Sequence, residues 1–313
     1  MILVTGSLAY DTIMDYPGAF SASIMPDKIH MLNVSFLVDE MRKGFGGTAG
    51  NIAYNLSLLG VKCAVFGVVG ADFLTYKEFL DRNEVNTSYI KTVNNLFTST
   101  AFGITDKKNN HIWGFYTGAD AISNHLSIAG IREKIDFGIV APHNPSAMVK
   151  FAQEYTAKKI NYLFDPGMQL PWLSKNDLCL GMEGAKVIIS NDYEMSVIKK
   201  KLSLGEKEQI GRRDQIIITT FSDEGSLINY NGTAWRIPAA KPKNNSDPAG
   251  AGDAYRAGFM AGYLRGYGMD VCGRMGSVAA VYTVEKYGTT THKYTVSEFT
   301  RRYKENFGES ISL

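Results

Sequence analysis

The segment 247–259 (Asp-Pro-Ala-Gly-Ala-Gly-Asp-Ala-Tyr-Arg-Ala-Gly-Phe) holds the residues of this chain that are best suited to chemistry. Gly250 and Gly252 permit backbone conformations that other residues resist, and they would leave main-chain N–H groups exposed where a predicted helix, 254–265, begins. Such donors, together with the helix dipole, favour an anion, phosphate above all. Asp253 lies beside them, where a carboxylate could accept the proton of an attacking hydroxyl. Taken alone, the pattern also fits a capped helix whose glycines allow close packing.

Bulk composition restricts the class of protein. The chain has 313 residues, 45% of them hydrophobic and 20% charged, which is ordinary for a globular enzyme with a full core. A net charge of +2 gives no argument for binding nucleic acid or an acidic membrane. The three cysteines and five histidines have neither disulfide nor zinc spacing. No apolar run is long enough to span a bilayer and the first residues lack a basic flank, so we expect a cytoplasmic protein.

Strands and helices are predicted to alternate through most of the chain. Apolar runs bounded by turn residues predict strands, and 3.6-residue periodicity predicts helices. This alternation is typical of a parallel sheet covered by helices on both faces, and Asn231-Gly232 marks an added antiparallel hairpin. The expected strands are 2–5, 61–69, 137–141, 161–165, 186–190, 215–220, 226–230 and 233–237, and the expected helices are 51–59, 72–82, 145–158, 175–182, 192–200, 254–265, 269–287 and 297–306.

A second, smaller sheet is predicted to interrupt this alternation. Residues 31–38, 98–105 and 111–116 have the composition of strands, and the last two flank a turn at Lys107-Lys108-Asn109-Asn110. Because these strands are inserted and not appended, we expect them to form a lid on one domain. The expected domain is 1–313, with the lid formed by about 12–45 and 96–118.

Polar residues follow several of the predicted strands. Ligands of open α/β sheets bind beyond the carboxyl ends of the strands, where these side chains would meet. A buried carboxylate such as Asp11 is costly without hydrogen-bond donors, although Asp11 also fits a simple turn. The residues at strand ends are Ser7, Asp11, Asp165, Asn191 and Ser222.

Three motifs, in this order along the chain, resemble the signatures of one enzyme family. Residues 46–51 are similar to the N-terminal signature, 191–194 to the Asn-x-x-Glu motif, and 247–259 to the C-terminal signature of the ribokinase-like (PfkB) sugar and nucleoside kinases. The resemblance covers essentially the whole chain and implies a ribokinase-like three-layer α/β/α sandwich with a small β-sheet lid. Segments 5–11 and 164–171 are similar, more narrowly, to bacterial adenosine kinases and, for the second, to archaeal nucleoside kinases.

The resemblance implies transfer of the γ-phosphoryl group of ATP to the 5′-hydroxyl of a purine nucleoside, with adenosine as the first candidate. Asp253 would be the catalytic base, and Asp11 would hold the ribose. The implied anion hole is Ala249, Gly250, Ala251 and Gly252, and the implied substrate contacts are Ser7, Asp11, Phe36, Gly46, Gly47, Asn51, Phe102, Phe115 and Gln169.

On the nucleotide side, the resemblance implies that Asn191 and Glu194 hold Mg²⁺ through water, a spacing that also fits a helix-capping pair. Arg256 would reach phosphate oxygens, unless it is a solvated helix charge. Ser222 stands where the family has the first glycine of its nucleotide loop, which leaves the phosphate donor open. The implied ATP contacts are Asn191, Thr220, Ser222, Gly225, Asp247 and Arg256.

Other functions remain to be weighed. A ribose or hexose kinase of the same family, or a broad-specificity nucleoside kinase that takes guanosine, inosine or cytidine, stays open. A dinucleotide-dependent dehydrogenase is disfavoured because residues 6–10 lack Gly-x-Gly-x-x-Gly, and a non-catalytic sensor is disfavoured by Asp253. Lid strands with an apolar face predict edge pairing with a second subunit. The resemblance to adenosine kinases implies a homodimer in which the lid contributes to the partner's site. No nucleic-acid or membrane partner is expected, and a requirement for K⁺ stays open.

Overall fold

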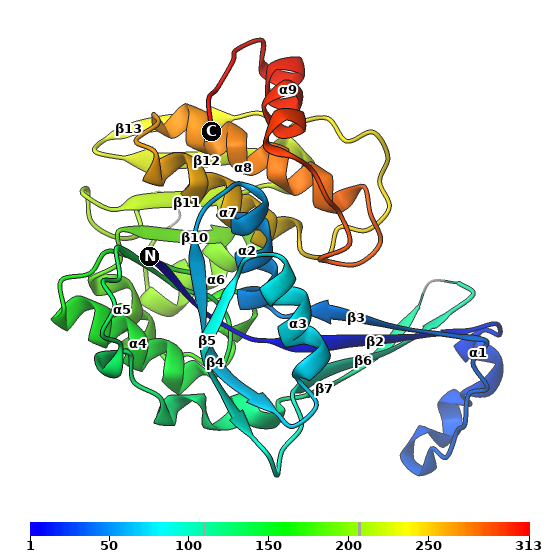
Figure 1. Cartoon of the computed structure of the whole chain (residues 1–313). Coiled ribbons are helices and arrows are strands. Elements are labelled where there is room, and N and C mark those ends of the chain that lie inside the picture. Colours follow the sequence, from blue (N-terminus) through cyan, green and yellow to red (C-terminus); the bar gives the residue numbers. More distant parts are fainter. Residues whose placement is uncertain (109, 206–207) are drawn as a thin grey trace.

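A long mixed sheet forms the centre of the computed structural model, which describes residues 1–108, 110–205 and 208–313 (Figure 1). The strands of this main sheet are β1 (Ile2–Thr5), β4 (Cys63–Gly70), β5 (Asn86–Val93), β8 (Phe137–Val140), β9 (Tyr162–Phe164), β10 (Val187–Asn191), β11 (Ile216–Thr220), β12 (Ser226–Tyr230) and β13 (Thr233–Ile237). Within the described residues their order is β13-β12-β11-β10-β9-β8-β1-β4-β5. The strands from β11 to β5 run parallel, and β12 and β13 add an antiparallel hairpin at one edge.

Helices cover both faces of the main sheet (Figure 1). They are α2 (Thr48–Leu58), α3 (Leu74–Arg82), α4 (Pro145–Ala157), α5 (Lys175–Glu183), α6 (Asp192–Leu202), α7 (Ala251–Leu264), α8 (Met269–Val284) and α9 (Val296–Phe307). Apolar side chains of α2, α3, α7 and α8 pack on one face, those of α4, α5 and α6 pack on the other, and α9 packs outside α8. Central strands buried on both faces, such as β4, carry continuous apolar runs. The three-layer sandwich predicted from the sequence is confirmed.

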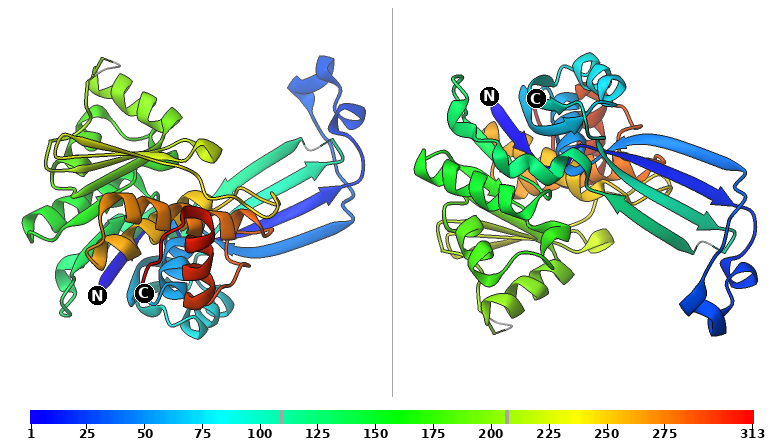
Figure 2. Two further views of the ribbon diagram at one scale, coloured as in Figure 1. Left: turned by 90° about the horizontal axis from the view of Figure 1, so that it is seen from above. Right: turned by 90° about the horizontal axis from the view of Figure 1, so that it is seen from below.

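A small sheet projects from the main body as an arm (Figure 2). Its strands are β2 (Ala9–Tyr16), β3 (Glu40–Gly46), β6 (Ser99–Asp106) and β7 (His111–Tyr116), in the order β3-β2-β6-β7. Strands β2 and β6 pair in parallel, and the other two pairings are antiparallel. Two short helical segments, α1 (Phe20–Ser23) and η1 (Pro26–Met31), lie at the far end of the arm (Figure 1).

The sequence misplaced one strand of the small sheet. Residues 32–38, within the expected strand 31–38, lie outside the strands of the described chain, and Glu40–Gly46 pairs with β2 instead. The first four residues of β3 are exposed, so this strand has no apolar alternation that would reveal it. In the predicted turn at 107–110, Asn109 lies outside the described residues.

Several short or polar elements were not predicted at all. Edge strand β5 is largely polar, and the 3₁₀ segments, of three to eight residues, are too short to show a period. These segments are η2 (Gly118–His125), η3 (Ile128–Gly130), η4 (Gly167–Gln169) and η5 (Ser222–Glu224). Among the described residues, no helix has the length and apolar character needed to cross a membrane.

Candidate active site

Two helices begin side by side, and each follows a glycine with positive φ. Gly47 has φ 83° before α2, and Gly250 has φ 77° before α7. Nδ2 of Asn51, on α2, donates a hydrogen bond of 2.9 Å to Oδ2 of Asp253, on α7. Asn51 and Asp253 lie 202 positions apart in the sequence. The two glycine motifs therefore meet at one place in the fold.

A cavity of about 450 Å³ opens at this meeting point, between the main sheet and the small sheet. Of the site residues expected from the sequence, it is lined by Ser7, Asp11, Gly47, Asn51, Phe115, Gln169, Gly250 and Asp253. The sequence analysis missed others, among them Thr48, Thr117, Asp120, His143, Asn144, Met168 and Thr289. His143 and Asn144 closely follow β8, so the strand-end rule that selected Ser7 and Asp165 applied to them as well.

Asp11 lies on the face of the small sheet that borders the cavity. It is in register with Gly44 on β3 and Ala101 on β6, and Ala101 is in register with Phe115 on β7. A Cβ atom at Gly46 would overlap the carboxylate of Asp11, so only glycine leaves room there. Burial, with a smaller contribution from the charge of Asp247, raises the pKa of Asp11 to about 6. Among the described residues, no group donates a hydrogen bond to this carboxylate.

Asp253 and Arg256 belong to a buried group of charges. Nε of Arg256 lies 2.5 Å from Oδ2 of Asp165, and the two side chains are 9% and 2% exposed. Burial raises the pKa of Asp253, while the charge of Arg256 and the hydrogen bond from Asn51 lower it. Arg256 is therefore not a solvated helix charge, and it is held by a carboxylate at the end of β9.

The loop before α7 offers fewer free donors than expected. The N–H of Ala249 donates to Oδ1 of Asp247 over 2.9 Å, and that of Ala251 donates to the Pro248 carbonyl over 3.2 Å. In this structure both N–H groups already have an acceptor inside the loop. Within the described chain the N–H groups of Gly250, Gly252 and Asp253 have no acceptor, because they belong to the first turn of the helix or precede it.

Asp247 supports this loop with both carboxylate oxygens. Its Oδ1 accepts from Ala249, and its Oδ2 accepts from the N–H of Gly288 over 3.0 Å. Asp247 therefore ties the loop before α7 to the backbone of Gly288.

The predicted nucleotide loop follows β11 directly. Its residues Ser222 and Gly225 have positive φ values of 51° and 96°, and Phe221 donates to the Gly225 carbonyl over 2.8 Å. Ser222 thus adopts a left-handed conformation that glycine would take without strain. Thr220 ends β11 next to Asn191, since the two residues are in register.

Asn191 and Glu194 form a reciprocal capping box at the start of α6. Oδ1 of Asn191 accepts from the N–H of Glu194 over 2.8 Å, and Oε2 of Glu194 accepts from the N–H of Asn191 over 2.9 Å. Burial and the nearby charge of Asp165 raise the pKa of Glu194. The capping interpretation is therefore correct, and it leaves Oε1 of Glu194 outside the cap.

Only one of the three aromatic residues expected at the purine lines the cavity. Phe115 does so, whereas Phe102 is in register with Thr12 and Gly114 and so lies on the opposite face of the small sheet. Phe36 packs at the far end of the arm against Tyr16 and Phe20, with ring centroids 4.9 and 5.0 Å away. Phe36 and Phe102 therefore do not line this cavity: Phe102 lies on the other face of the sheet, and Phe36 lies in the segment between η1 and β3.

Comparison with known proteins agrees with this geometry. A sequence model of the pfkB family of carbohydrate kinases matches residues 2–295, and the chain belongs to that family. The enzyme is accordingly a phosphotransferase with an alcohol group as acceptor.

Relatives with a more specific description cover nearly the whole chain. The nucleoside kinase of Methanothermobacter thermautotrophicus is 31% identical over 93% of this chain and 94% of its own, and that of Methanocaldococcus jannaschii is 30% identical over 94% and 95%. The structure of Burkholderia thailandensis nucleoside kinase in complex with inosine has a TM-score of 0.88, 33% identity and 99% coverage of both chains. The same enzyme in complex with ADP-inosine has a TM-score of 0.86 and 34% identity, with 99% and 97% of the two chains covered.

Proposed function

We propose that this protein uses ATP to phosphorylate the 5′-hydroxyl of purine nucleosides, with adenosine as the first candidate and inosine included. One observation carries the proposal: Asp253 stands between a cavity that bears the carboxylate of Asp11 and a helix N-terminus with free N–H groups. A nucleoside in the cavity would point its hydroxyl at the carboxylate, and phosphate would lie on the helix start. The resemblance to nucleoside kinases, one of them bound to inosine, supports the choice of acceptor.

Asp253 would accept the proton of the attacking 5′-hydroxyl. The free N–H groups of Gly250, Gly252 and Asp253 would donate to oxygens of the transferred phosphoryl group, whose charge they stabilise. Asp253 must be ionised to act, and Arg256 favours that form. The guanidinium also lies against the loop, since a Cβ at Gly252 would come within 2.7 Å of Nη1 of Arg256.

Arg256 would therefore act in two ways. It would keep Asp253 charged, and its terminal nitrogens would contact phosphate, because they donate no hydrogen bond within the described part of the chain. Asp165 would hold the guanidinium in this orientation.

Magnesium fits the residues at the start of α6. Mg²⁺ prefers oxygen ligands and retains several waters, and Glu194 keeps one carboxylate oxygen outside the capping box. Glu194, with Asn191 beside it, would hold the ion through water, and the bound ion would supply positive charge for the phosphates of ATP. Thr220, Ser222 and Gly225 would contact the nucleotide from the neighbouring strand.

Asp11 would accept hydrogen bonds from the ribose 2′- and 3′-hydroxyls, which would replace the water lost on burial. Phe115 would pack against the purine, and Ser7 and Gln169 would bond to its edge. The hydroxyl of Ser7 already accepts from the N–H of Thr48 over 3.0 Å, so it stays oriented to donate to the ligand.

The test is a coupled assay of ADP release with adenosine, inosine, guanosine, cytidine, ribose and fructose as acceptors. We expect turnover with purine nucleosides, little with free sugars, and loss of at least 1,000-fold in kcat for Asp253→Asn. Turnover only with ribose or fructose would show that the acceptor is a free sugar and not a nucleoside. Full activity of the variant would remove Asp253 from the mechanism.

We also propose a homodimer through the small sheet. Met41, Met14, Ile104 and Ile112 are in register across its four strands on the face away from the cavity, and Met41 and Ile112 are 66% and 42% exposed. Such an apolar row fits a second copy of the chain. We expect a dimer by light scattering at micromolar concentration and a monomer for Ile112→Lys. A monomeric wild type would contradict this.

A further inference from the structure

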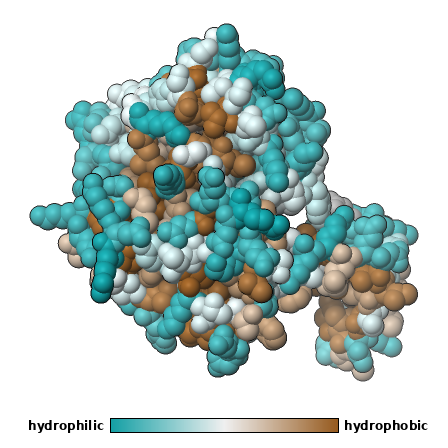
Figure 3. Space-filling view, in the orientation of Figure 1, coloured by the Kyte–Doolittle hydropathy of each residue, from teal (hydrophilic) through white to brown (hydrophobic). Residues whose placement is uncertain are grey.

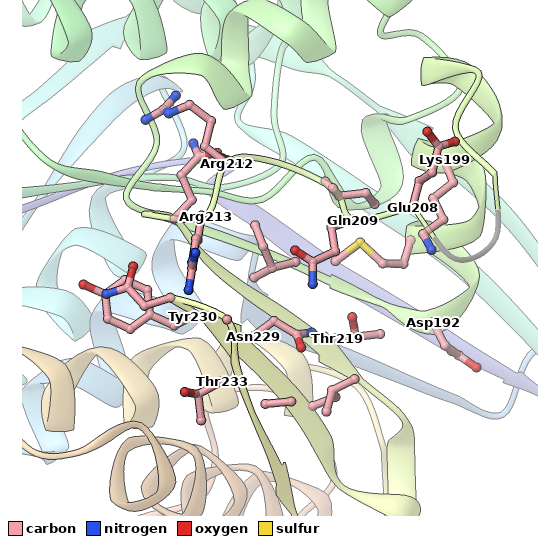
Figure 4. A pocket seen from close by; sticks show the side chains of 18 of the residues that line it. Asp192, Lys199, Glu208, Gln209, Arg212, Arg213, Thr219, Asn229, Tyr230 and Thr233 are labelled. Atoms are coloured by element: carbon pink, nitrogen blue, oxygen red, sulfur yellow. Dashed lines mark hydrogen bonds between the residues drawn. The ribbon is translucent and has the colours of Figure 1, made fainter.

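A second cavity, larger than the first, lies on the other side of the molecule's main sheet from α7 and α8. It has a volume of about 560 Å³ and is bordered by α6, by residues 208–213 and by strands β11 to β13. Figure 4 shows its side chains converging from these elements. Cavities of this volume hold small organic ligands in other proteins.

The cavity exists because the helical layer ends before the sheet does. On β11, Ile216 and Ile218 face the core beneath α7, so Ile217 and Thr219 face the other side. Thr219 is in register with Leu227, and Ile217 with Asn229, which extends that face onto β12. Helix α6 is the last helix over this face, and beyond it the cavity replaces packed side chains.

The lining combines an apolar floor with charges at opposite ends. Ile217, Leu227 and Met195 provide apolar surface. Arg213 and Asp192 lie at the two ends of the cavity, with Asn229 between them, and Lys199 and Glu208 line the side on which Asp192 lies (Figure 4).

Three of these polar side chains are not used elsewhere. Within residues 1–108, 110–205 and 208–313, the side chains of Arg213, Asp192 and Asn229 have no hydrogen-bond or ion-pair partner. Arg213 nonetheless has a defined place, because a Cβ at Gly232 would come within 3.0 Å of its Nη2. Neighbouring Arg212 also borders the cavity, but its guanidinium is engaged: Nε contacts Asp214 over 3.1 Å and Nη1 donates to the Glu183 carbonyl.

We propose that this cavity is a regulatory site for a nucleoside monophosphate that carries an exocyclic amine, such as AMP. Phosphate would pair with Arg213, the ring system would cover the apolar floor, and the amine would donate to Asp192. The side-chain amide of Asn229 can donate to and accept from a base edge.

Two elements connect this cavity to the candidate active site. Asp192, Met195 and Ser196 lie on the cavity side of α6, the helix whose first residues are capped by Asn191 and Glu194. Thr219 and Phe221 line the cavity, and they flank Thr220 at the start of the nucleotide loop. A ligand held here contacts the same helix and strand that would position ATP, so its binding is coupled to nucleotide affinity.

The experiment measures binding of AMP and IMP to the full chain by titration calorimetry, without ATP. We expect two AMP molecules per chain in the wild type, one in the candidate active site and one in the second cavity. Ala234→Trp fills the second cavity from β13, and Arg213→Met removes its cation; both should leave one AMP per chain and a kcat within twofold of wild type. Arg212→Met, with the same change of charge one residue away, should still bind two.

IMP tests the contact between the amine and Asp192. It carries a keto oxygen in place of the exocyclic amine of AMP, and this oxygen cannot donate a hydrogen bond to the carboxylate. We expect IMP to bind the second site at least tenfold more weakly than AMP. A single AMP per chain that is displaced by adenosine, or two AMP molecules in both Ala234→Trp and Arg213→Met, overturns the site. Because the readout is binding, this result is independent of which acceptor the enzyme phosphorylates.

Discussion

Replacing Arg256 with methionine separates the structural and chemical roles of the buried charges. The side chains of Arg256 and Asp165 are 9% and 2% exposed, so the pair is scarcely screened by solvent. Removing one partner of such a pair leaves an uncompensated charge and costs about 3–5 kcal/mol of unfolding free energy. For a domain of this size we expect Tm to fall by roughly 10 °C.

The same substitution acts on catalysis through Asp253. Arg256 lowers the pKa of Asp253 against the effect of burial, so its loss raises that pKa. The proposed base Asp253 would be active when ionised, so activity would disappear as pH falls, and in Arg256→Met this acid limb would move to higher pH. Because the proposed contact of Arg256 with phosphate would also be lost, we expect kcat at neutral pH to fall by about 100- to 1,000-fold.

The double variant Asp165→Leu/Arg256→Met provides the decisive comparison. Apolar replacement of a whole buried ion pair is about neutral for stability, so we expect Tm to recover towards the wild-type value. Activity should stay as low as in Arg256→Met. Calorimetry and kcat–pH profiles check both points. If kcat recovers together with Tm, or if Arg256→Met keeps the wild-type pH profile, Arg256 is only structural and our reasoning is refuted.

Three further predictions concern the substrate cavity. Asp11 has a folded-state pKa of about 6, raised above its unfolded value, so its ionisation opposes folding as pH rises from about 4 to 6. Without ligand at pH 7.5, Asp11→Asn should therefore increase the free energy of unfolding by up to about 3 kcal/mol, seen as a higher Tm. The same substitution should raise KM for the nucleoside at least 100-fold. Gly46→Ala should displace the Asp11 carboxylate and raise KM for the nucleoside about tenfold or more. Circular dichroism should show that the fold is unchanged. Phe115→Ala should raise KM for inosine by about 10-fold. Phe102→Ala, on the opposite face of the small sheet, should keep kcat and KM for inosine within about threefold of the wild-type values. Equal effects of the two substitutions would show that the assigned faces are wrong.

The main sheet could be predicted because its strands are buried on both faces and separated by turn residues. Strands such as β4 and β10 carry continuous apolar runs, and their helices show 3.6-residue periodicity. The small sheet was harder. Its strand β3 is exposed on both faces over most of its length, so pairing with β2, and not burial, determines its conformation.

For the site, sequence reasoning identified residue types at strand and helix ends, but not the partners of their polar groups. It found Asp253, Asn51 and Asp11, which meet at one cavity. It could not show that Arg256 is held by Asp165, because that contact joins β9 to α7. It also could not show which loop N–H groups are free, since that depends on the turn adopted by each peptide.

The path of the chain from β1 into β2 has a further consequence. Residues 6–8 join a central strand of the main body to the strand that carries Asp11, whereas Asp253 belongs to the rigid helical layer. Any bending of the arm at this joint changes the separation of two carboxylates that repel one another. The ribose hydroxyls that we propose as partners of Asp11 would offset this repulsion, so an empty site would favour an open arm and a filled site would tolerate closure. Access of water to the phosphoryl group would then depend on whether an acceptor is bound.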